Sequence, residues 1–268
     1  MSEGTDKAAL AGALSRLDLP LRTLEPGHVW LVGAGPGDPG LLTLNALSAL
    51  AQADALVYDA LVSSEIVAVA GQAEKFYVGK RGGRLSIPQD DINALLVRLA
   101  KEGRKVVRLK GGHPYVFGRG GEEALALAAN AVPYRVLPGI TSAFGGLASA
   151  GIPVTMRGVN GAIILATGFA AVSDDRPDWS ALARTGQPIV VYMGLTHMAD
   201  TVADLRAGGL AYDTPAALIE NATLPEERTV VATLGTLLEA AERENIVSPA
   251  LIVVGGIVAL RAALAGQQ

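Results

Sequence analysis

Short apolar runs that each end in a glycine-rich turn are the feature that most constrains the fold of this chain. The runs at 29–32, 106–109 and 188–192, and a shorter run ending at 137, are predicted strands. A glycine turn follows each of them, at 33–40, 111–113, 138–142 and 192–194. Ligands of α/β folds bind at the carboxyl ends of strands. Four such turns therefore predict a ligand cleft that needs bare backbone on several sides.

Helical segments alternate with these strands. The clearest helix runs over 88–102, where Pro88 suits the first turn and Gly103 can close the end. Its apolar face is formed by Ile92, Leu95, Leu96 and Leu99. A helix is also expected from about residue 40, with Leu44, Leu47 and Ala51 on its apolar face, and another over 122–130.

The alternation of strands and helices predicts an α/β fold with mainly parallel pairing and right-handed crossovers. Further strands are expected at 53–58, 161–166, 215–219 and 249–254, and one ends at Val78. We predict a tail with one loose helix over 1–26, an α/β domain over 27–137 and a second over 138–268. The ligand cleft is expected between the two domains.

Composition excludes several classes of function. Half of the 268 residues are hydrophobic and the net charge is −4, which favours a large core and argues against nucleic acid as a partner. The chain has no cysteine and its three histidines are far apart, so no metal site is predicted. The uncharged segment 136–156 contains Pro138 and Pro153. It is therefore interpreted as a loop and a buried helix of small residues, and the protein is expected in the cytoplasm, not in a membrane.

The first glycine turn, 33–40, formally satisfies the dinucleotide fingerprint G-x-G-x-x-G, and Asp59 follows 19 residues after Gly40. Pro36 and Pro39 remove amide donors that a pyrophosphate would need. The turn therefore favours close approach of another ligand to the backbone over the dinucleotide binding of an NAD-dependent oxidoreductase. A purely structural turn is the alternative.

Charged residues near these turns suggest an anionic ligand. Guanidinium groups suit carboxylates and phosphates, although each residue could also belong to a solvated basic face. The basic residues concerned are Lys80, Arg81, Arg84, Arg108, Lys110 and Arg119. Among the acids, Asp38 is expected to form a turn, and Asp59 at a strand end could act as a base or orient a ligand.

Eight segments together resemble the tetrapyrrole methylases, in family order and at nearly the family's spacing, over roughly residues 29–258. They are GAGPGDPGLLTL (33–44), VYDALVS (57–63), VGKRGG (78–83), PQDDIN (88–93), RLKGGHPYVFGRGGEE (108–123), PGITSA (138–143), GIPVT (151–155) and YMG (192–194). The similarity is greatest to members that methylate uroporphyrinogen III.

The resemblance implies two α/β domains, a homodimer and S-adenosyl-L-methionine as the methyl donor, which leaves as S-adenosyl-L-homocysteine. Positions that match the family's donor-binding residues are Pro36, Gly111, Gly112, His113, Val116, Thr141, Ser142, Met193 and Ala222. Asp59 matches the proposed general base and Lys80 a proposed proton donor. The carboxylates of the tetrapyrrole are then expected to meet Lys80, Arg81, Arg84 and Arg119, with Tyr192 as a further substrate contact.

The activity that the resemblance implies is methylation of uroporphyrinogen III at C2 and C7 to give precorrin-2, on the route to cobalamin and sirohaem. The chain departs from the family pattern at four positions. His113 stands where Asp is usual, and Leu85, Met156 and Phe169 stand where members often have His. Methylation of a corrin ring or of a protein in the diphthamide pathway, and silent tetrapyrrole binding, are the alternatives.

Overall fold

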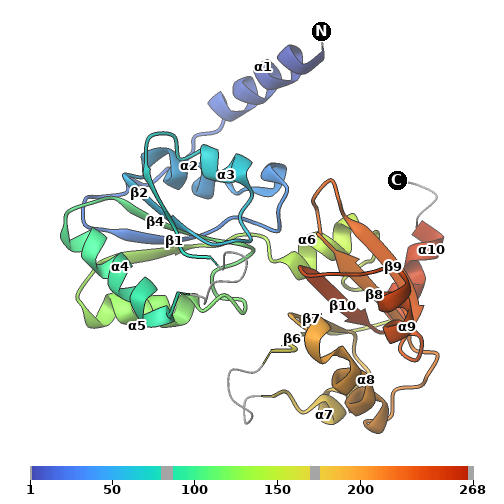
Figure 1. The fold of residues 1–268 in the computed structure, drawn as a ribbon. Helices are drawn as coiled ribbons and strands as arrows, with labels where there is room; N and C mark the ends of the chain where they lie inside the picture. Colours follow the sequence, from blue (N-terminus) through green and yellow to red (C-terminus); the bar gives the residue numbers. More distant parts are fainter. Residues whose placement is uncertain (1, 80–86, 170–175, 265–268) are drawn as a thin grey trace.

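A computed structural model describes residues 2–79, 87–169 and 176–264 and contains two five-stranded sheets (Figure 1). The first sheet is formed by β1 (Val29–Gly33), β2 (Ala55–Tyr58), β3 (Glu74–Tyr77), β4 (Val106–Lys110) and β5 (Tyr134–Leu137). The second is formed by β6 (Ile164–Thr167), β7 (Ile189–Tyr192), β8 (Pro215–Glu220), β9 (Arg228–Thr233) and β10 (Ala250–Val254). The two-domain α/β architecture predicted from the sequence is confirmed.

The first sheet is parallel throughout, with strand order β3-β2-β4-β1-β5. The chain leaves β1 toward β2 on one side, and it leaves the neighbouring β4 toward β5 on the other side. Connections that diverge in this way create a topological switch point, where open α/β sheets bind ligands at the carboxyl ends of the strands.

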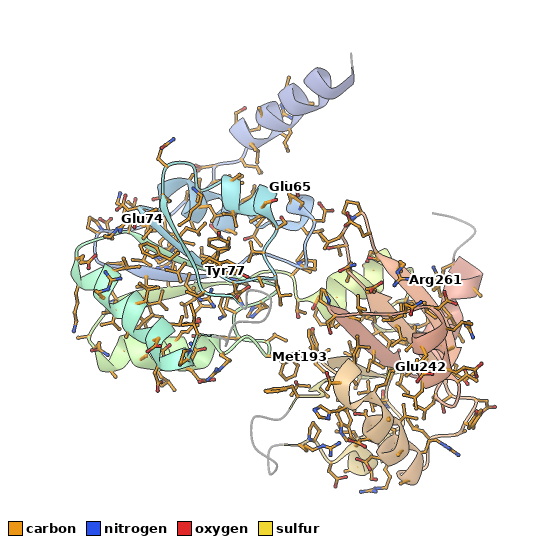
Figure 2. All side chains as sticks on the ribbon, in the orientation of Figure 1. Glu65, Glu74, Tyr77, Met193, Glu242 and Arg261 are labelled. Atoms are coloured by element: carbon orange, nitrogen blue, oxygen red, sulfur yellow. The ribbon has the colours of Figure 1, made fainter. Side chains whose placement is uncertain are left out.

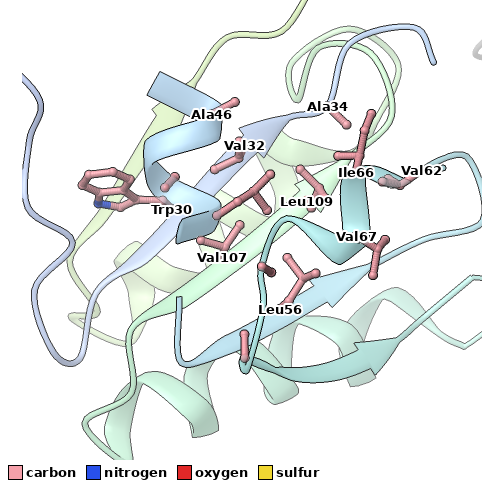
Figure 3. Close-up of a cluster of buried hydrophobic side chains, with 14 of the residues drawn as sticks. Trp30, Val32, Ala34, Ala46, Leu56, Val62, Ile66, Val67, Val107 and Leu109 are labelled. Atoms are coloured by element: carbon pink, nitrogen blue, oxygen red, sulfur yellow. The ribbon is translucent and has the colours of Figure 1, made fainter. Parts of the chain in front are cut away.

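Helices cover both faces of the first sheet. On one face α2 (Leu44–Gln52) and α3 (Ser64–Ala68) pack over Val32, Leu56 and Leu109 (Figure 3). On the other face α4 (Gln89–Lys101) and α5 (Gly120–Ala129) pack over Leu31, Val57 and Val106. Neighbouring strand residues contribute to opposite clusters, as the alternation of side chains along a strand requires.

The second sheet is mixed, so the expectation of mainly parallel pairing is wrong for this half. The strand order is β6-β7-β10-β8-β9; only β6 and β7 pair in parallel, and the other pairs are antiparallel. Seven residues, 221–227, join β8 to β9, which is too short for the crossover that parallel strands need. Strand β9 was not predicted because it is a half-exposed edge strand with polar ends.

Two groups of helices cover the second sheet. One face carries α7 (Trp179–Arg184), α8 (Met198–Ala207) and α9 (Leu237–Arg243). The other carries α6 (Ser142–Ser149) and the 3-10 helix η4 (Gly256–Ala259), which leads into α10 (Leu260–Leu264). Helix α6 is the small-residue helix expected within 136–156. In the described part of the chain, the remaining helices are α1 (Ser2–Ser15), which projects from the N-terminal domain, and the 3-10 helices η1 (Pro39–Leu41) and η3 (Leu195–His197) (Figure 1).

Two predicted helical faces have different outcomes. In α4 the buried residues include Ile92, Leu96 and Leu99, as predicted. In α2, however, Leu44 and Leu47 are exposed, and the buried residues are Ala46, Ala49 and Leu50. The helix begins after Thr43, whose hydroxyl accepts a hydrogen bond from Ala46 N–H and so sets its start. The small side chains let α2 approach the sheet closely, a fit that a hydropathy pattern does not reveal.

Candidate active site

Three of the predicted glycine turns meet at the carboxyl end of the first sheet. Gly35 and Gly112 exchange backbone hydrogen bonds of 3.2 and 2.7 Å. A Cβ on Gly139 would lie 2.3 Å from the carbonyl oxygen of Gly112, and one on Gly33 would lie 2.4 Å from the amide of Gly139. Only glycine permits this approach, so the turns at 33–40, 111–113 and 138–142 form one junction of bare backbone.

The first turn also reaches the second domain. Asp38 N–H donates to the hydroxyl of Thr223 at 3.2 Å, and Pro36 lies against Gly145 of α6, where a Cβ would be 2.6 Å from Pro36 Cγ. The carboxylate of Asp38 accepts from Gly40 N–H at 2.7 Å, which confirms it as a turn-former. The junction is therefore bordered by both domains.

The turn at 138–142 is tied to β7 by Tyr192. A hydrogen bond of 2.6 Å joins the hydroxyls of Thr141 and Tyr192, and Ala143 N–H donates to Tyr192 at 3.1 Å. The ring of Tyr192 packs against Phe117 with the centroids 5.0 Å apart. Tyr192 is buried, so its observed contacts are to α6 and Phe117; a contact with substrate stays a prediction.

The other predicted donor-binding residues border the same junction. Val116 and Ala222 both pack against the buried cluster that contains Tyr192 and Ala143. Met193 follows Tyr192, is half exposed and lies on the side of the second domain that faces the first (Figure 2). The structure thus brings these residues to the same junction as the three glycine turns, and their role in donor binding stays a prediction.

His113 takes part in a local turn. Its Nδ1 accepts a hydrogen bond of 3.1 Å from Tyr115 N–H, two residues later in the chain. The carboxylate of an aspartate makes the same bond in Asx turns. His113 can therefore replace the aspartate that is usual in the family without loss of the turn.

Asp59 follows β2 and is partly exposed. Its Oδ1 accepts from Leu61 N–H at 3.3 Å, and its Oδ2 lies 3.3 Å from Nη2 of Arg108. Gly79 lies against Ala60, because a Cβ there would be 2.5 Å from Ala60 N. The backbone that precedes Lys80 therefore passes beside Asp59. Lys80 itself lies outside the described residues, as do Arg81, Arg84 and Leu85.

Three of the candidate basic residues, Arg108, Lys110 and Arg119, are described, and each forms an ion pair. Arg108 and Lys110 are buried and both bind Glu123, so the interpretation that they face an anionic ligand is wrong. Their strand is buried on both faces, and a charge in such a strand needs a partner. Arg119 is exposed and forms two hydrogen bonds with Glu122, which lower the pKa of that carboxyl. A role of Arg119 with substrate stays a prediction.

Backbone strain marks the same region and was not predicted. Seven described residues other than glycine have positive φ, and five of them lie in loops at the junction. These five are Phe117, Arg119, Met193, Asn221 and Thr223. Such strain gathers at functional sites. A single sequence gives no signal for it, because bulky residues rarely adopt this conformation.

Besides His113, the described departures from the family pattern are Met156 and Phe169, and both are exposed. Phe169 follows Gly168, where a Cβ would lie 2.5 Å from Gly194 Cα, and thus lies close to the turn that carries Met193. Met156 N–H donates to Asn160 in a separate turn. An apolar side chain therefore stands beside the junction at Phe169.

The fold and this junction define a two-domain α/β protein with a candidate ligand site between its two sheets. The family model of the tetrapyrrole (corrin/porphyrin) methylases matches residues 28–238. The chain belongs to the tetrapyrrole methylase family.

Relatives with known names agree with this assignment. A uroporphyrinogen-III C-methyltransferase of a Sinorhizobium species is 49% identical over 247 residues, which are 91% of this chain and 88% of the relative. A siroheme synthase of Neisseria meningitidis serogroup B is 50% identical over 242 residues, 90% of this chain but 50% of that protein. The chain thus spans about half the length of the siroheme synthases that it matches.

Solved structures share the fold. The Thermus thermophilus uroporphyrin-III C-methyl transferase complexed with S-adenyl homocysteine has a TM-score of 0.75 at 40% identity, covering 87% of this chain and 99% of that chain. A cobalt precorrin-4 methyltransferase has a TM-score of 0.77 at 26% identity, covering 87% and 96%. Fold similarity therefore does not separate the two enzymes, whereas sequence identity does.

Within residues 2–79, 87–169 and 176–264, none of the helices is long and apolar enough to span a membrane. Within the same ranges, no cluster of three or more histidine, aspartate or glutamate side chains could hold a metal ion.

Proposed function

We propose that this protein is an S-adenosyl-L-methionine-dependent C-methyltransferase that methylates uroporphyrinogen III at C2 and C7 to give precorrin-2. The junction of three bare-backbone turns carries the proposal, because the nine positions that match the family's donor-binding residues border it. The similarity to the Sinorhizobium uroporphyrinogen-III C-methyltransferase over 91% of the chain supports this substrate above others.

The residues at the junction suit a nucleoside sulfonium such as S-adenosyl-L-methionine better than a dinucleotide. A Cβ on Gly112 would have only Ser142 N and Thr141 Cα as neighbours, at 3.8 and 3.9 Å, so its backbone is open on that side. Val116, Met193 and Ala222 offer small or apolar surface, which suits an adenosyl group. Pro36 and Pro39 lack the amide donors that a pyrophosphate needs.

When bound, S-adenosyl-L-methionine supplies a methyl group on a sulfonium sulfur that a nucleophilic carbon can attack. The protein then has to align the pyrrole carbon with that methyl, and alignment alone provides about 7–11 kcal/mol in well-oriented systems. Bare backbone at 111–113 and the ordered loop around Ala222 would hold the donor. Glu227 fixes that loop by accepting a hydrogen bond of 2.6 Å from Thr223 N–H.

Attack by the pyrrole carbon leaves a cationic ring that must lose a proton. In the proposal Asp59 accepts it, since its carboxylate is partly exposed at the end of β2, where ligands of such sheets bind. Lys80 is the proposed proton donor. The substrate's carboxylates would meet Lys80, Arg81, Arg84 and Arg119, with Tyr192 nearby. A homodimer in the cytoplasm and a product that feeds cobalamin or sirohaem synthesis complete the proposal.

One alternative has a specific observation behind it. The cobalt precorrin-4 methyltransferase matches the fold as well as the Thermus uroporphyrin-III enzyme does, and Phe169 adds apolar surface near Met193. A corrin-ring substrate is therefore the second candidate. This candidate is the weaker one, because the cobalt precorrin-4 methyltransferase is only 26% identical to this chain, against 40% for the Thermus enzyme.

Anaerobic incubation with uroporphyrinogen III and methyl-labelled S-adenosyl-L-methionine, followed by mass spectrometry of the tetrapyrrole, tests the proposal. We expect two added methyl groups. In Asp59→Asn, turnover should fall by about 100-fold or more while donor binding persists. Absence of methylation by a wild-type protein that binds the donor would contradict the proposed substrate, and a corrin-ring substrate would be tried next.

A further inference from the structure

A buried cluster of four charged side chains lies beside the proposed base. Arg108 and Lys110 stand two residues apart on β4 and therefore on the same face of the sheet. Glu123 reaches them from α5, and Asp59 follows the neighbouring strand β2. The side chain of Glu123 is fully buried and those of Arg108 and Lys110 are 4% exposed, whereas that of Asp59 is 26% exposed.

Hydrogen bonds fix the orientation of the Arg108 guanidinium on several sides. Its Nε donates to Glu123 Oε1 at 2.9 Å, and its Nη1 donates to the carbonyl of Leu109 at 3.1 Å. Its Nη2 is thereby directed at Asp59 Oδ2, 3.3 Å away. Lys110 Nζ donates to the same Glu123 oxygen at 3.0 Å. Planar guanidinium groups transmit orientation, because their donors point in fixed directions.

We propose that Glu123 is a positioning residue for the methyl transfer: it holds Arg108 so that this side chain orients the carboxylate of Asp59. The inference deepens the proposed function and rests on Asp59 as the base. Glu123 binds Arg108 and Lys110, and Arg108 in turn reaches Asp59, so Glu123 acts on the base through Arg108.

Charge balance supports the assignment. Arg108 and Lys110 bring two positive charges, which Glu123 and Asp59 compensate. Burial and the adjacent Arg108 already lower the pKa of Lys110, which means that the charged form of Lys110 is disfavoured in this cluster. If Glu123 is neutralised, the surplus positive charge favours the ionised form of Asp59. Asp59 then becomes a weaker proton acceptor, and its orientation is less restricted.

Glu123→Gln is the test variant, because glutamine has nearly the same shape and lacks the charge. Glu102→Gln is the matched control: Glu102 is exposed on the surface and pairs with Arg98 of α4, away from the junction. For each protein kcat would be measured against pH with uroporphyrinogen III, together with KM and the Kd of S-adenosyl-L-homocysteine by calorimetry. A merely structural role would not move the pH profile.

We expect kcat of Glu123→Gln to fall by up to about 100-fold, since misplacement of a catalytic group has this effect. The acidic limb of the kcat–pH profile of this variant should move to lower pH. KM and Kd should stay within about twofold of wild type, because the lost interaction acts on the transition state. Glu102→Gln should match wild type. Unchanged kcat and an unchanged pH profile in Glu123→Gln, with Asp59→Asn inactive, would overturn the positioning role alone.

Results for two other variants also bear on the positioning role. Wild-type turnover in Asp59→Asn would overturn the base assignment, and the positioning role with it. If Glu123→Gln does not fold, Arg108→Lys replaces it, because lysine keeps the charge and loses the fork that reaches both Glu123 and Asp59. Wild-type kcat in folded Arg108→Lys would equally overturn the proposal, and a similar fall in kcat would support it.

Discussion

At the scale of single residues, the turn at 111–113 depends on one acceptor atom. His113 Nδ1 accepts from Tyr115 N–H at 3.1 Å, and an aspartate carboxylate could take its place. The two residues differ in charge and volume, but they offer the same acceptor two residues before the amide. The turn itself therefore does not require the aspartate that is usual in the family.

This argument predicts the behaviour of two variants. His113→Asp should bind S-adenosyl-L-homocysteine about as well as wild type. His113→Phe keeps a ring but has no acceptor, and loss of one hydrogen bond should weaken binding by about 2- to 12-fold. Isothermal titration calorimetry measures both values. Equal affinity of His113→Phe and wild type would show that the bond does not contribute to donor binding.

A second prediction at this scale concerns Lys110. Burial, and then the neighbouring Arg108, lower the pKa of Lys110 below the usual 10.5. Between the lowered pKa and 10.5 the unfolded chain binds more protons than the folded protein, so this group adds stability as the pH rises. The free energy of unfolding of wild type relative to Lys110→Met should therefore increase as the pH rises from the lowered pKa of Lys110 toward 10.5. Urea denaturation at each pH gives this difference, and a flat or falling difference would contradict the shift.

At the scale of elements, the junction of glycine turns requires residues without a Cβ atom. A Cβ on Gly139 would lie 2.3 Å from Gly112 O and 2.8 Å from Gly33 C, and both neighbours are backbone atoms held in strands or turns. Flexible side chains could move aside, whereas these atoms cannot. A methyl group there must separate two of the three turns.

Gly139→Ala should therefore cost about 1–3 kcal/mol of stability, as overpacking does, and weaken donor binding. Gly161→Ala is the matched control, because a Cβ at Gly161 meets nothing within 4 Å and its φ is not positive. Urea denaturation of the two variants would show a difference. If both variants were as stable as wild type, the close approach of the turns would be wrong.

The elements also show what sequence alone can predict here. Glycine runs at strand ends located the junction, because close backbone approach leaves a clear composition signal. The direction of β10 and the existence of β9 depended on pairing between distant segments, for which one sequence has no signal. The buried charged cluster of Arg108, Lys110, Glu123 and Asp59 could be predicted only in part. Arg108 and Lys110 in a fully buried strand indicate that partners exist, but only the structure identifies Glu123 on α5.

At the scale of the whole molecule, residues of both domains border the candidate site. Asp38 of the first domain bonds to Thr223 of the second, and Val116 packs against the second domain's buried cluster. The boundary predicted between 137 and 138 lies at the start of the third glycine turn. A ligand held at this junction would contact both sides and so couple their unfolding.

This coupling yields a prediction for thermal unfolding. Ligand at about 100 times its Kd stabilises the folded state by about 2.7 kcal/mol, which for a chain of this size corresponds to a rise in Tm of about 5–10 °C. S-adenosyl-L-homocysteine should produce this rise for the whole calorimetric transition, because the site draws on both domains. Asp59→Asn should show the same rise, since Asp59 acts in the proposal on substrate and not on the donor. A ligand that raised only one of two separate transitions would place the donor within a single domain, and the role of the junction would then have to be abandoned.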